Sequence, residues 1–303
     1  MPALKILITG GQGFLGSNLE KFLKIKGHFV RADGFDILNF TESESIFSQQ
    51  KWDFVFHFAG ISHIPTSEAE PMKAFEANLL GTSMVIHFIK KFCPSAGLVF
   101  ASSAFVYDTS HLPVSSNHPI SEDFPVLGRN VYGQSKLQAE AIIRQASETW
   151  GLRAIVFRIF NHTHKSQSPI FFLPSVYQQI LKAKSEGTKI LRVGNLDLVR
   201  DIGSISDFLN GAYSLCENSN KFDKFEIFNI CSGVGKNLRV LLEILCQELD
   251  FRGEIEVDQT LVRQGEKLYV VGDPTKLITK TNWRPQTTCE RALVTSFLRE
   301  QIL

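Results

Sequence analysis

Short apolar runs, many of them rich in β-branched residues, recur through the first half of the chain with longer amphipathic segments between them. Such runs are typical of strands buried on both faces of a parallel sheet. The intervening segments 14–26, 72–92 and 131–150 are long enough for crossover helices, which right-handed connections place on both faces. The pattern therefore predicts an α/β fold with a doubly wound parallel sheet. The predicted strands are 4–9, 29–32, 54–58, 97–101 and 154–159.

Beyond residue 158 the alternation becomes less regular. Helical patterns cover 169–184, 204–215, 238–249 and 290–303, and strand patterns cover 189–193 and 226–230. We expect a first domain of residues 1–160, to which 204–231 returns, and a smaller α/β domain formed mainly by 161–303. Ser204 or Ser206 is expected near the start of its helix. The stretches 108–128 and 194–203 read as long loops, which in compact domains often border a ligand.

Composition narrows the class of protein. The formal charge of the 303 residues is +1 with both signs well mixed, which argues against a nucleic-acid or anionic-membrane partner. Five cysteines without a Cys-x-x-Cys pair indicate reduced thiols rather than a disulfide framework. The apolar stretch 4–8 is too short for a signal sequence or a spanning helix. We therefore expect a cytoplasmic protein that binds neither nucleic acid nor membrane.

A glycine motif lies between the first predicted strand and the first predicted helix. Gly10, Gly13 and Gly16 permit a tight turn, and the N–H groups of Phe14 and Leu15 at the helix start can approach a pyrophosphate. An ordinary glycine-rich turn is the alternative, but this placement favours a dinucleotide. The first domain is thus predicted to be an NAD(P)-binding Rossmann domain.

Asp33 follows the second predicted strand. A carboxylate there can accept hydrogen bonds from the adenosine ribose and repel a 2′-phosphate, which favours NAD. Arg31 lies close by in sequence, so NADP stays open.

Tyr132 and Lys136 are separated by one turn of the predicted helix 131–150. They therefore share one face, where the lysine charge is expected to lower the tyrosine pKa from about 10 toward working pH. A hydroxyl tuned in this way can act as a general acid or base. Ser103 follows the fourth predicted strand, at the sheet edge where ligands bind. A strand-end serine that satisfies the backbone is the alternative for Ser103 alone, but three such residues in order predict a catalytic set.

The glycine spacing, Ser103 and Tyr132-x-x-x-Lys136 together resemble the extended branch of the short-chain dehydrogenase/reductase superfamily, whose members act on nucleotide sugars. The second half resembles the subgroup of GDP-mannose dehydratases and GDP-4-keto-6-deoxymannose reductases. That likeness rests on Arg158-Ile-Phe-Asn-His-Thr163, Arg200-Asp201, Arg263-x-x-Glu266, Gly272-Asp-Pro-x-Lys276 and Trp283-Arg-Pro285.

The resemblance implies roles for individual residues. Tyr132 would exchange a proton with the substrate, Lys136 would bind the nicotinamide ribose, and Ser103 would hold the reacting carbonyl oxygen. Arg200 and Arg263 would clamp the diphosphate of a nucleotide-diphosphate sugar. The further cofactor contacts implied are Asp36, Ile37, Phe58, Ala59, Gly60, Asn78, Ala101, Ser102, Phe160 and His162. The further substrate contacts implied are Ala104, Asn161, Leu173, Val193 and Glu266.

Some of these assignments have alternatives. A helix cap is the alternative for Asp36, and His164-Lys165, where the family usually has Gly-Pro, predicts a reshaped sugar-facing loop. His162 and His164 lack a third ligand at a convincing spacing, so no metal site is predicted.

The residues after Ser103 bear on the type of reaction. Dehydratases of this family carry an acid there for the departing hydroxyl, whereas this chain has Ala104-Phe105. We therefore expect a reductase that acts on a 4-keto-6-deoxy sugar nucleotide. A nucleotide-sugar C4 epimerase with retained NAD is the close alternative. A non-catalytic dinucleotide sensor that binds a protein partner is the alternative from another class, and the intact set of Ser103, Tyr132 and Lys136 counts against it.

The resemblance also implies a homodimer. Segments 72–92 and 131–150 would form its face, with Phe75, Leu79 and Phe88 as apolar positions. These three side chains could equally pack on the sheet.

Overall fold

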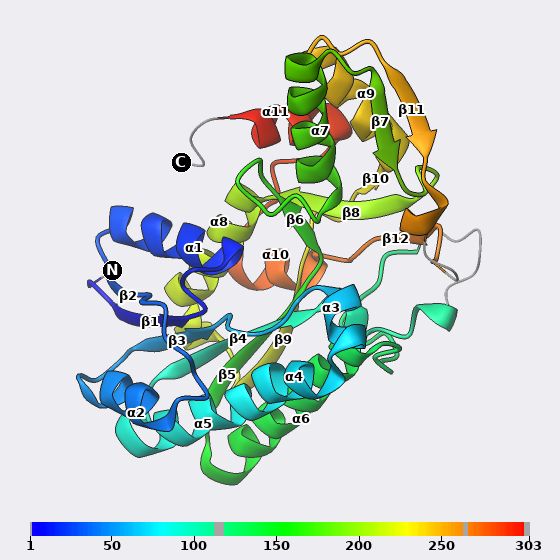
Figure 1. Cartoon of the computed structure of the whole chain (residues 1–303). Helices are drawn as coiled ribbons and strands as arrows, with labels where there is room; N and C mark the ends of the chain where they lie inside the picture. Colours follow the sequence, from blue (N-terminus) through cyan, green and yellow to red (C-terminus); the bar gives the residue numbers. More distant parts are fainter. Residues whose placement is uncertain (1, 112–117, 263–265, 300–303) are drawn as a thin grey trace.

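A parallel sheet forms the centre of the first part of the molecule (Figure 1). The computed structural model describes residues 2–111, 118–262 and 266–299. The sheet order is β2-β1-β3-β4-β5-β9, and every neighbouring pair is parallel. Each of the five apolar runs forms a strand, so the predicted parallel sheet is confirmed. The strands are β1 (Lys5–Thr9), β2 (Phe29–Arg31), β3 (Phe54–His57), β4 (Gly97–Ser103), β5 (Arg153–Ile159) and β9 (Phe225–Ile230).

Helices cover both faces of this sheet, each over its own apolar core (Figure 1). Because both faces are buried, the strands carry nearly continuous apolar runs. The doubly wound architecture is confirmed. One face carries α1 (Phe14–Ile25), α8 (Ile205–Glu217) and α10 (Thr275–Thr281), and the other carries α2 (Phe40–Ser48), α5 (Gly81–Phe92) and α6 (Val131–Trp150).

The single helix expected over 72–92 consists of three successive pieces. They are α4 (Pro71–Phe75), the π-helical turn η1 (Glu76–Leu80) and α5, preceded by the short α3 (Ile64–Ala69). Phe88 is fully buried against the sheet. Its expected role on a dimer face is therefore wrong, because the ring fills the core beneath α5.

The second part of the molecule has its own strands and core, and lies above the main sheet in Figure 1. β8 (Val199–Ser204) is parallel to β6 (Asn161–Thr163) and β12 (Tyr269–Val270), and antiparallel to β10 (Gly235–Asn237). A separate parallel pair joins β7 (Ile190–Val193) to β11 (Glu254–Val257). The packed helices are α7 (Phe172–Glu186), α9 (Leu238–Glu248) and α11 (Glu290–Leu298). Besides η1, the short helical turns among the described residues are η2 (Ala104–Val106), η3 (Thr109–His111), η4 (Ser219–Lys221) and η5 (Gln259–Leu261).

The structure corrects one prediction and settles another. The expected loop 194–203 contains most of β8, whose polar residues and glycine carry a weak local strand signal, so the strand depends on pairing with its neighbours. Ser204 rather than Ser206 caps α8, because its side chain accepts a hydrogen bond from the Asp207 N–H at 3.1 Å.

Residues 204–231 supply α8 and β9 to the main sheet and its core. The domain boundary at residue 160 stays a prediction. Among the described helices, none has the length and apolar character needed to cross a membrane.

Candidate active site

The predicted site residues gather at the carboxyl edge of the main sheet. β1, β3 and β4 end there with Thr9, His57 and Ser103, since parallel strands end at the same edge. This edge faces the second part of the molecule, because β5 continues through Phe160 directly into β6, which pairs with β8.

The glycine turn packs closely against the end of β3. Gly10 has a φ of +71°, and a Cβ atom there would lie 2.5 Å from the backbone nitrogen of Ala59. α1 starts directly after Gly13, which brings no side chain to cover the N–H groups of the first helical turn. Those N–H groups have no partner within their own helix, which makes the position suited to a pyrophosphate.

The residues expected around the adenosine have distinct surroundings. Asp33 is exposed, and its carboxylate pairs with the Arg31 Nε at 2.7 Å. Asp36 accepts a hydrogen bond from the Leu38 N–H at 3.0 Å, whereas α2 is capped by Asn39. The helix-cap alternative for Asp36 is therefore wrong. The Ile37 side chain is buried in the core, which leaves its backbone as the part able to meet a ligand.

A chain of buried hydrogen bonds begins at the glycine turn. His57 bonds through Nδ1 to the Thr9 hydroxyl at 2.7 Å and through Nε2 to the Thr82 hydroxyl at 3.1 Å. Burial, together with the charge of Lys136, lowers the pKa of His57 to about 3. The imidazole is therefore neutral and serves to join β1, β3 and α5.

Asn78 extends this chain to the helix that carries Tyr132. Its side-chain amide bonds to both backbone groups of Ile61, at 2.9 and 3.0 Å, and donates to the Ser135 hydroxyl at 2.8 Å. Ser135 in turn donates to the Tyr132 carbonyl oxygen. The resemblance identified Asn78, whereas Thr9, His57, Thr82 and Ser135 were missed because isolated polar residues give no periodic signal.

Ser103, Tyr132 and Lys136 are all nearly buried, with relative exposures of 5%, 7% and 4%. Asn130 accepts a hydrogen bond from the Gly133 N–H at 2.7 Å. It is therefore the N-cap of α6, whose first turn bears Tyr132. The side chains of Ser103 and Tyr132 are hydrogen bonded to each other. The fold thus brings the strand-end serine to the phenol.

The expected effect of Lys136 on the pKa of Tyr132 is wrong. Burial raises the pKa of Tyr132, and the hydrogen bond with Ser103 opposes that rise. The Lys136 ammonium lies 4.8 Å from the centre of the Phe100 ring, and burial lowers its own pKa to about 8. Desolvation of the buried phenol is the largest cause of the rise in its pKa. The phenol is consequently protonated at neutral pH.

Glu140, one turn beyond Lys136 on α6, is a residue that the sequence did not reveal. It is buried and pairs with Arg158 of β5 through an Nη2–Oε2 distance of 2.8 Å and an Nε–Oε1 distance of 3.2 Å. Its charge opposes the lowering of the Lys136 pKa. The Ser102 hydroxyl also donates a hydrogen bond to Glu140. The side chain of Ser102, a predicted cofactor contact, is therefore already hydrogen bonded within the protein.

Several predicted cofactor contacts line the apolar interior near the same edge. Phe58 packs against Phe56 and Phe208. His162 bonds through Nδ1 to the Phe160 carbonyl oxygen at 3.0 Å, and burial lowers its pKa to about 4. Ala101 lies within β4 and is buried, whereas Gly60 follows β3 and is exposed.

The predicted substrate residues divide into two groups. Arg200 and Glu266 are brought together, with an Nη2–Oε1 distance of 3.5 Å, and Asn161 donates to the Asp201 carbonyl oxygen at 3.2 Å. Leu173 and Val193 are buried in the core of the second part. Their backbone groups are therefore the parts able to meet a substrate, and the substrate contact expected for both residues stays a prediction. Arg263 lies outside the described residues.

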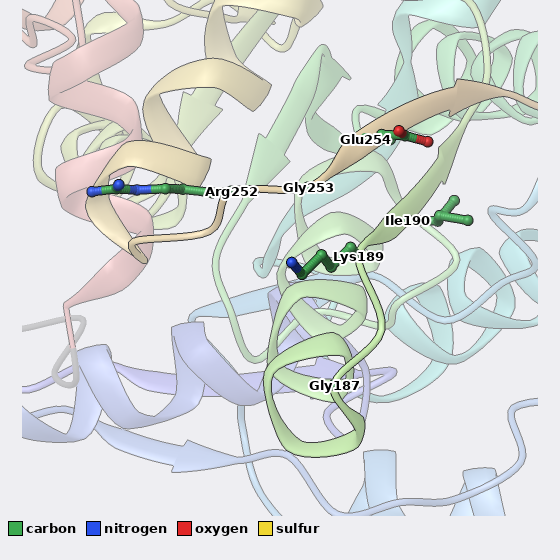
Figure 2. Close-up of a pocket in the computed structure, with 6 residues that line it drawn as sticks. All are labelled: Gly187, Lys189, Ile190, Arg252, Gly253 and Glu254. Carbon is green, nitrogen blue, oxygen red and sulfur yellow. The ribbon is translucent and has the colours of Figure 1, made fainter.

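Two surface cavities differ in their relation to these residues. One of about 610 Å³ is lined by residues of the second part, and it contains none of the predicted site residues (Figure 2). Its lining residues are Gly187, Lys189, Ile190, Arg252, Gly253 and Glu254. The other, about 580 Å³, lies beside the start of α6. There Glu68 accepts a hydrogen bond from the Val131 N–H at 2.9 Å, which ties α3 to the helix of Tyr132.

A Rossmann sheet with a glycine turn, a strand-end serine and a Tyr-x-x-x-Lys helix at its carboxyl edge defines an NAD(P)-dependent enzyme of the extended short-chain dehydrogenase/reductase type. Residues 29–295 match the family described as GDP-mannose 4,6 dehydratase, and the chain belongs to that family.

Two relatives and one solved structure match nearly the whole length of this chain. The GDP-6-deoxy-D-mannose reductase of Pseudomonas aeruginosa is 29% identical over 95% of this chain and 94% of its own. The GDP-6-deoxy-D-talose 4-dehydrogenase of Aggregatibacter actinomycetemcomitans is 27% identical over 99% of each. A solved structure of RMD from Pseudomonas aeruginosa complexed with NADPH matches with a TM-score of 0.84 and 28% identity, over 97% of this chain and 99% of that one.

Proposed function

We propose that this protein reduces the keto group of a 4-keto-6-deoxy sugar nucleotide, GDP-linked, with NAD(P)H. The observation that carries the proposal is geometric: the buried Tyr132 phenol lies beside Ser103 at the carboxyl edge of the sheet. A protonated phenol can give its proton to a keto oxygen. The residues that follow Ser103 are Ala104 and Phe105, which supply no acid for an elimination. The relatives named above, a reductase and a dehydrogenase of GDP-linked 6-deoxy sugars, support the same substrate class.

The residues of the chain have separate roles in this reaction. Bound nicotinamide supplies or accepts the hydride. The Ser103 hydroxyl donates a hydrogen bond to the keto oxygen and orients it, while Tyr132 transfers its proton to that oxygen. Lys136, one turn further along α6, would bind the nicotinamide ribose. Arg200 of β8 carries the charge suited to the diphosphate.

The test is a panel of GDP-, UDP-, CDP- and dTDP-linked 4-keto-6-deoxy sugars, each with NADH and with NADPH. A reductase oxidises the added cofactor in a substrate-dependent manner, followed as a loss of absorbance of the reduced form. A C4 epimerase would instead purify with bound NAD and consume none. If the protein bound the cofactor but turned over none of these sugars, the proposal would be overturned. The non-catalytic dinucleotide sensor would then be the favoured alternative.

Cofactor preference gives a second test at the Arg31–Asp33 pair. Replacing Asp33 with Ser removes a carboxylate that would repel a 2′-phosphate and releases Arg31 to attract it. We expect Asp33→Ser to raise the ratio of kcat/KM for NADPH to that for NADH by roughly ten-fold, equivalent to about 1.4 kcal/mol. Asp223→Ser, an exposed aspartate just before β9 at the amino edge of the sheet, is the matched control. If Asp33→Ser leaves the ratio of kcat/KM for NADPH to that for NADH unchanged, the adenosine ribose does not bind beside Asp33.

We further propose that the protein is a cytoplasmic homodimer. Its five cysteines are free, as is usual in a reducing compartment. α5 and α6 lie side by side on one face (Figure 1). Met72 and Leu80 expose 72% and 51% of their surface close to these helices, which supports a partner subunit at this face.

A further inference from the structure

Phe105 is a large apolar side chain exposed directly beside the candidate catalytic residues. It belongs to η2, two residues after Ser103, and 43% of its surface is exposed. Its ring centre lies 6.1 Å from that of Tyr132 in an edge-to-face arrangement. Val126 and Leu127 of the adjoining loop are also exposed, and Leu127 bonds through its N–H to the Val106 carbonyl oxygen. The surface next to Tyr132 is therefore apolar on this side.

The position of Phe105 is fixed by its backbone. Its N–H donates to the Ser103 hydroxyl oxygen at 3.2 Å. A Cβ atom on Gly133 would lie 2.4 Å from the Phe105 carbonyl oxygen, so the turn packs directly on the first turn of α6. The backbone of Phe105 is therefore held against both Ser103 and the helix that bears Tyr132. An exposed aromatic ring held in this way is suited to contact a ligand.

The chemistry of the sugar indicates what the ring contacts, and this step rests on the proposed function. If Tyr132 protonates the oxygen on C4, the ring beside it lies next to the substituents of C3 and C5. C3 of a hexose carries a hydroxyl, whereas C5 of a 6-deoxy sugar carries a methyl group, C6. We propose that Phe105 contacts this C6 methyl group and selects 6-deoxy over 6-hydroxy 4-keto sugars.

The contact between the Phe105 ring and C6 sets the expected size of the preference for the 6-deoxy substrate. A hydroxyl on C6 would lose hydration against the ring without gaining a partner from it. Apolar sites reject an added hydroxyl by at most about a hundred-fold. Because the Phe105 ring is only partly enclosed, we expect roughly ten-fold in kcat/KM.

The experiment compares two GDP-linked 4-keto hexoses that differ only at C6, one with a methyl and one with a hydroxymethyl group. The wild-type protein should favour the methyl substrate by roughly ten-fold. Phe105→Ser should reduce this preference to within about three-fold, mainly through slower turnover of the methyl substrate, and Phe105→Leu should retain most of it. Phe29→Ser, a more exposed phenylalanine at the amino end of β2, is the matched control and should keep the wild-type ratio.

The ratio of kcat/KM for the methyl substrate to that for the hydroxymethyl substrate separates the outcomes. Both substrates are measured on one preparation, so any loss of folded protein cancels. If the wild type reduces the two sugars equally, or if Phe105→Ser keeps the wild-type ratio, the assignment of Phe105 is overturned while the reductase proposal stands. If the wild type reduces neither sugar, the proposed function is overturned and the role of Phe105 with it.

Discussion

Tyr132→Phe is expected to lower kcat/KM for reduction of the keto sugar by roughly a hundred- to ten-thousand-fold, the contribution typical of a positioned general acid. The substitution removes the one phenolic proton that lies beside Ser103 and keeps the ring that packs against Phe105. The loss should appear in kcat, because the proton moves in the transition state. Steady-state rates from the absorbance of the reduced cofactor measure it.

Cofactor binding and stability distinguish this loss from a structural defect. The Tyr132 hydroxyl makes its side-chain bond to Ser103, so its removal should change the free energy of unfolding by about 1 kcal/mol. NAD(P)H should still bind, as judged by the fluorescence of the reduced nicotinamide. Tyr213→Phe, on α8 against Phe22 and His28, is the matched control and should keep full activity. Wild-type turnover in Tyr132→Phe would refute the assigned role.

Arg158→Ala is expected to lower the free energy of unfolding by about 3–5 kcal/mol. The variant leaves the Glu140 carboxylate buried without its charged partner, since both side chains are only 5% exposed. The guanidinium also lies over the Tyr107 ring and donates to the Glu122 carbonyl oxygen at 3.0 Å, and these contacts are lost as well. Urea unfolding of each protein, with the midpoint and slope fitted together, gives the measurement.

A surface pair serves as the reference for Arg158→Ala. Arg291 and Glu248 are joined at 2.8 Å but are 60% and 41% exposed, so Arg291→Ala should cost less than about 1 kcal/mol. The double variant Arg158→Met with Glu140→Leu removes both charges and should be more stable than Arg158→Ala alone. If Arg158→Ala cost no more than Arg291→Ala, the buried pair would not carry the stability assigned to it.

The Arg158–Glu140 pair also bears on the active site. Glu140 joins β5 to α6 and binds Ser102, the neighbour of Ser103. On the other side of α6, Asn78 and Ser135 tie the same helix to the loop after β3. Tyr132 and Lys136 are therefore held by two separate buried networks. Neither network is visible as a sequence motif, because its members come from distant segments.

Local patterns were sufficient for the architecture of the first part. Apolar runs such as 54–58 are typical of strands buried on both faces of a parallel sheet, and their short length favours a strand over a helix. The turn at Gly10 and the i, i+4 spacing of Tyr132 and Lys136 are local as well. The second part was less accessible, because β8 depends on pairing with β6, β10 and β12 rather than on its own residues.

The sequence by itself determined the strands of the main sheet, the glycine turn and the order of Ser103, Tyr132 and Lys136, because each depends on spacing along the chain. Only the tertiary structure decided the pKa values of these side chains. Spacing alone predicts a lowered pKa for Tyr132, but the folded protein raises it. The fold also supplied Glu140 as the carboxylate acting on Lys136, and placed Phe105 against the phenol. Burial and contacts between distant segments set these properties, and they exist only once the chain has folded.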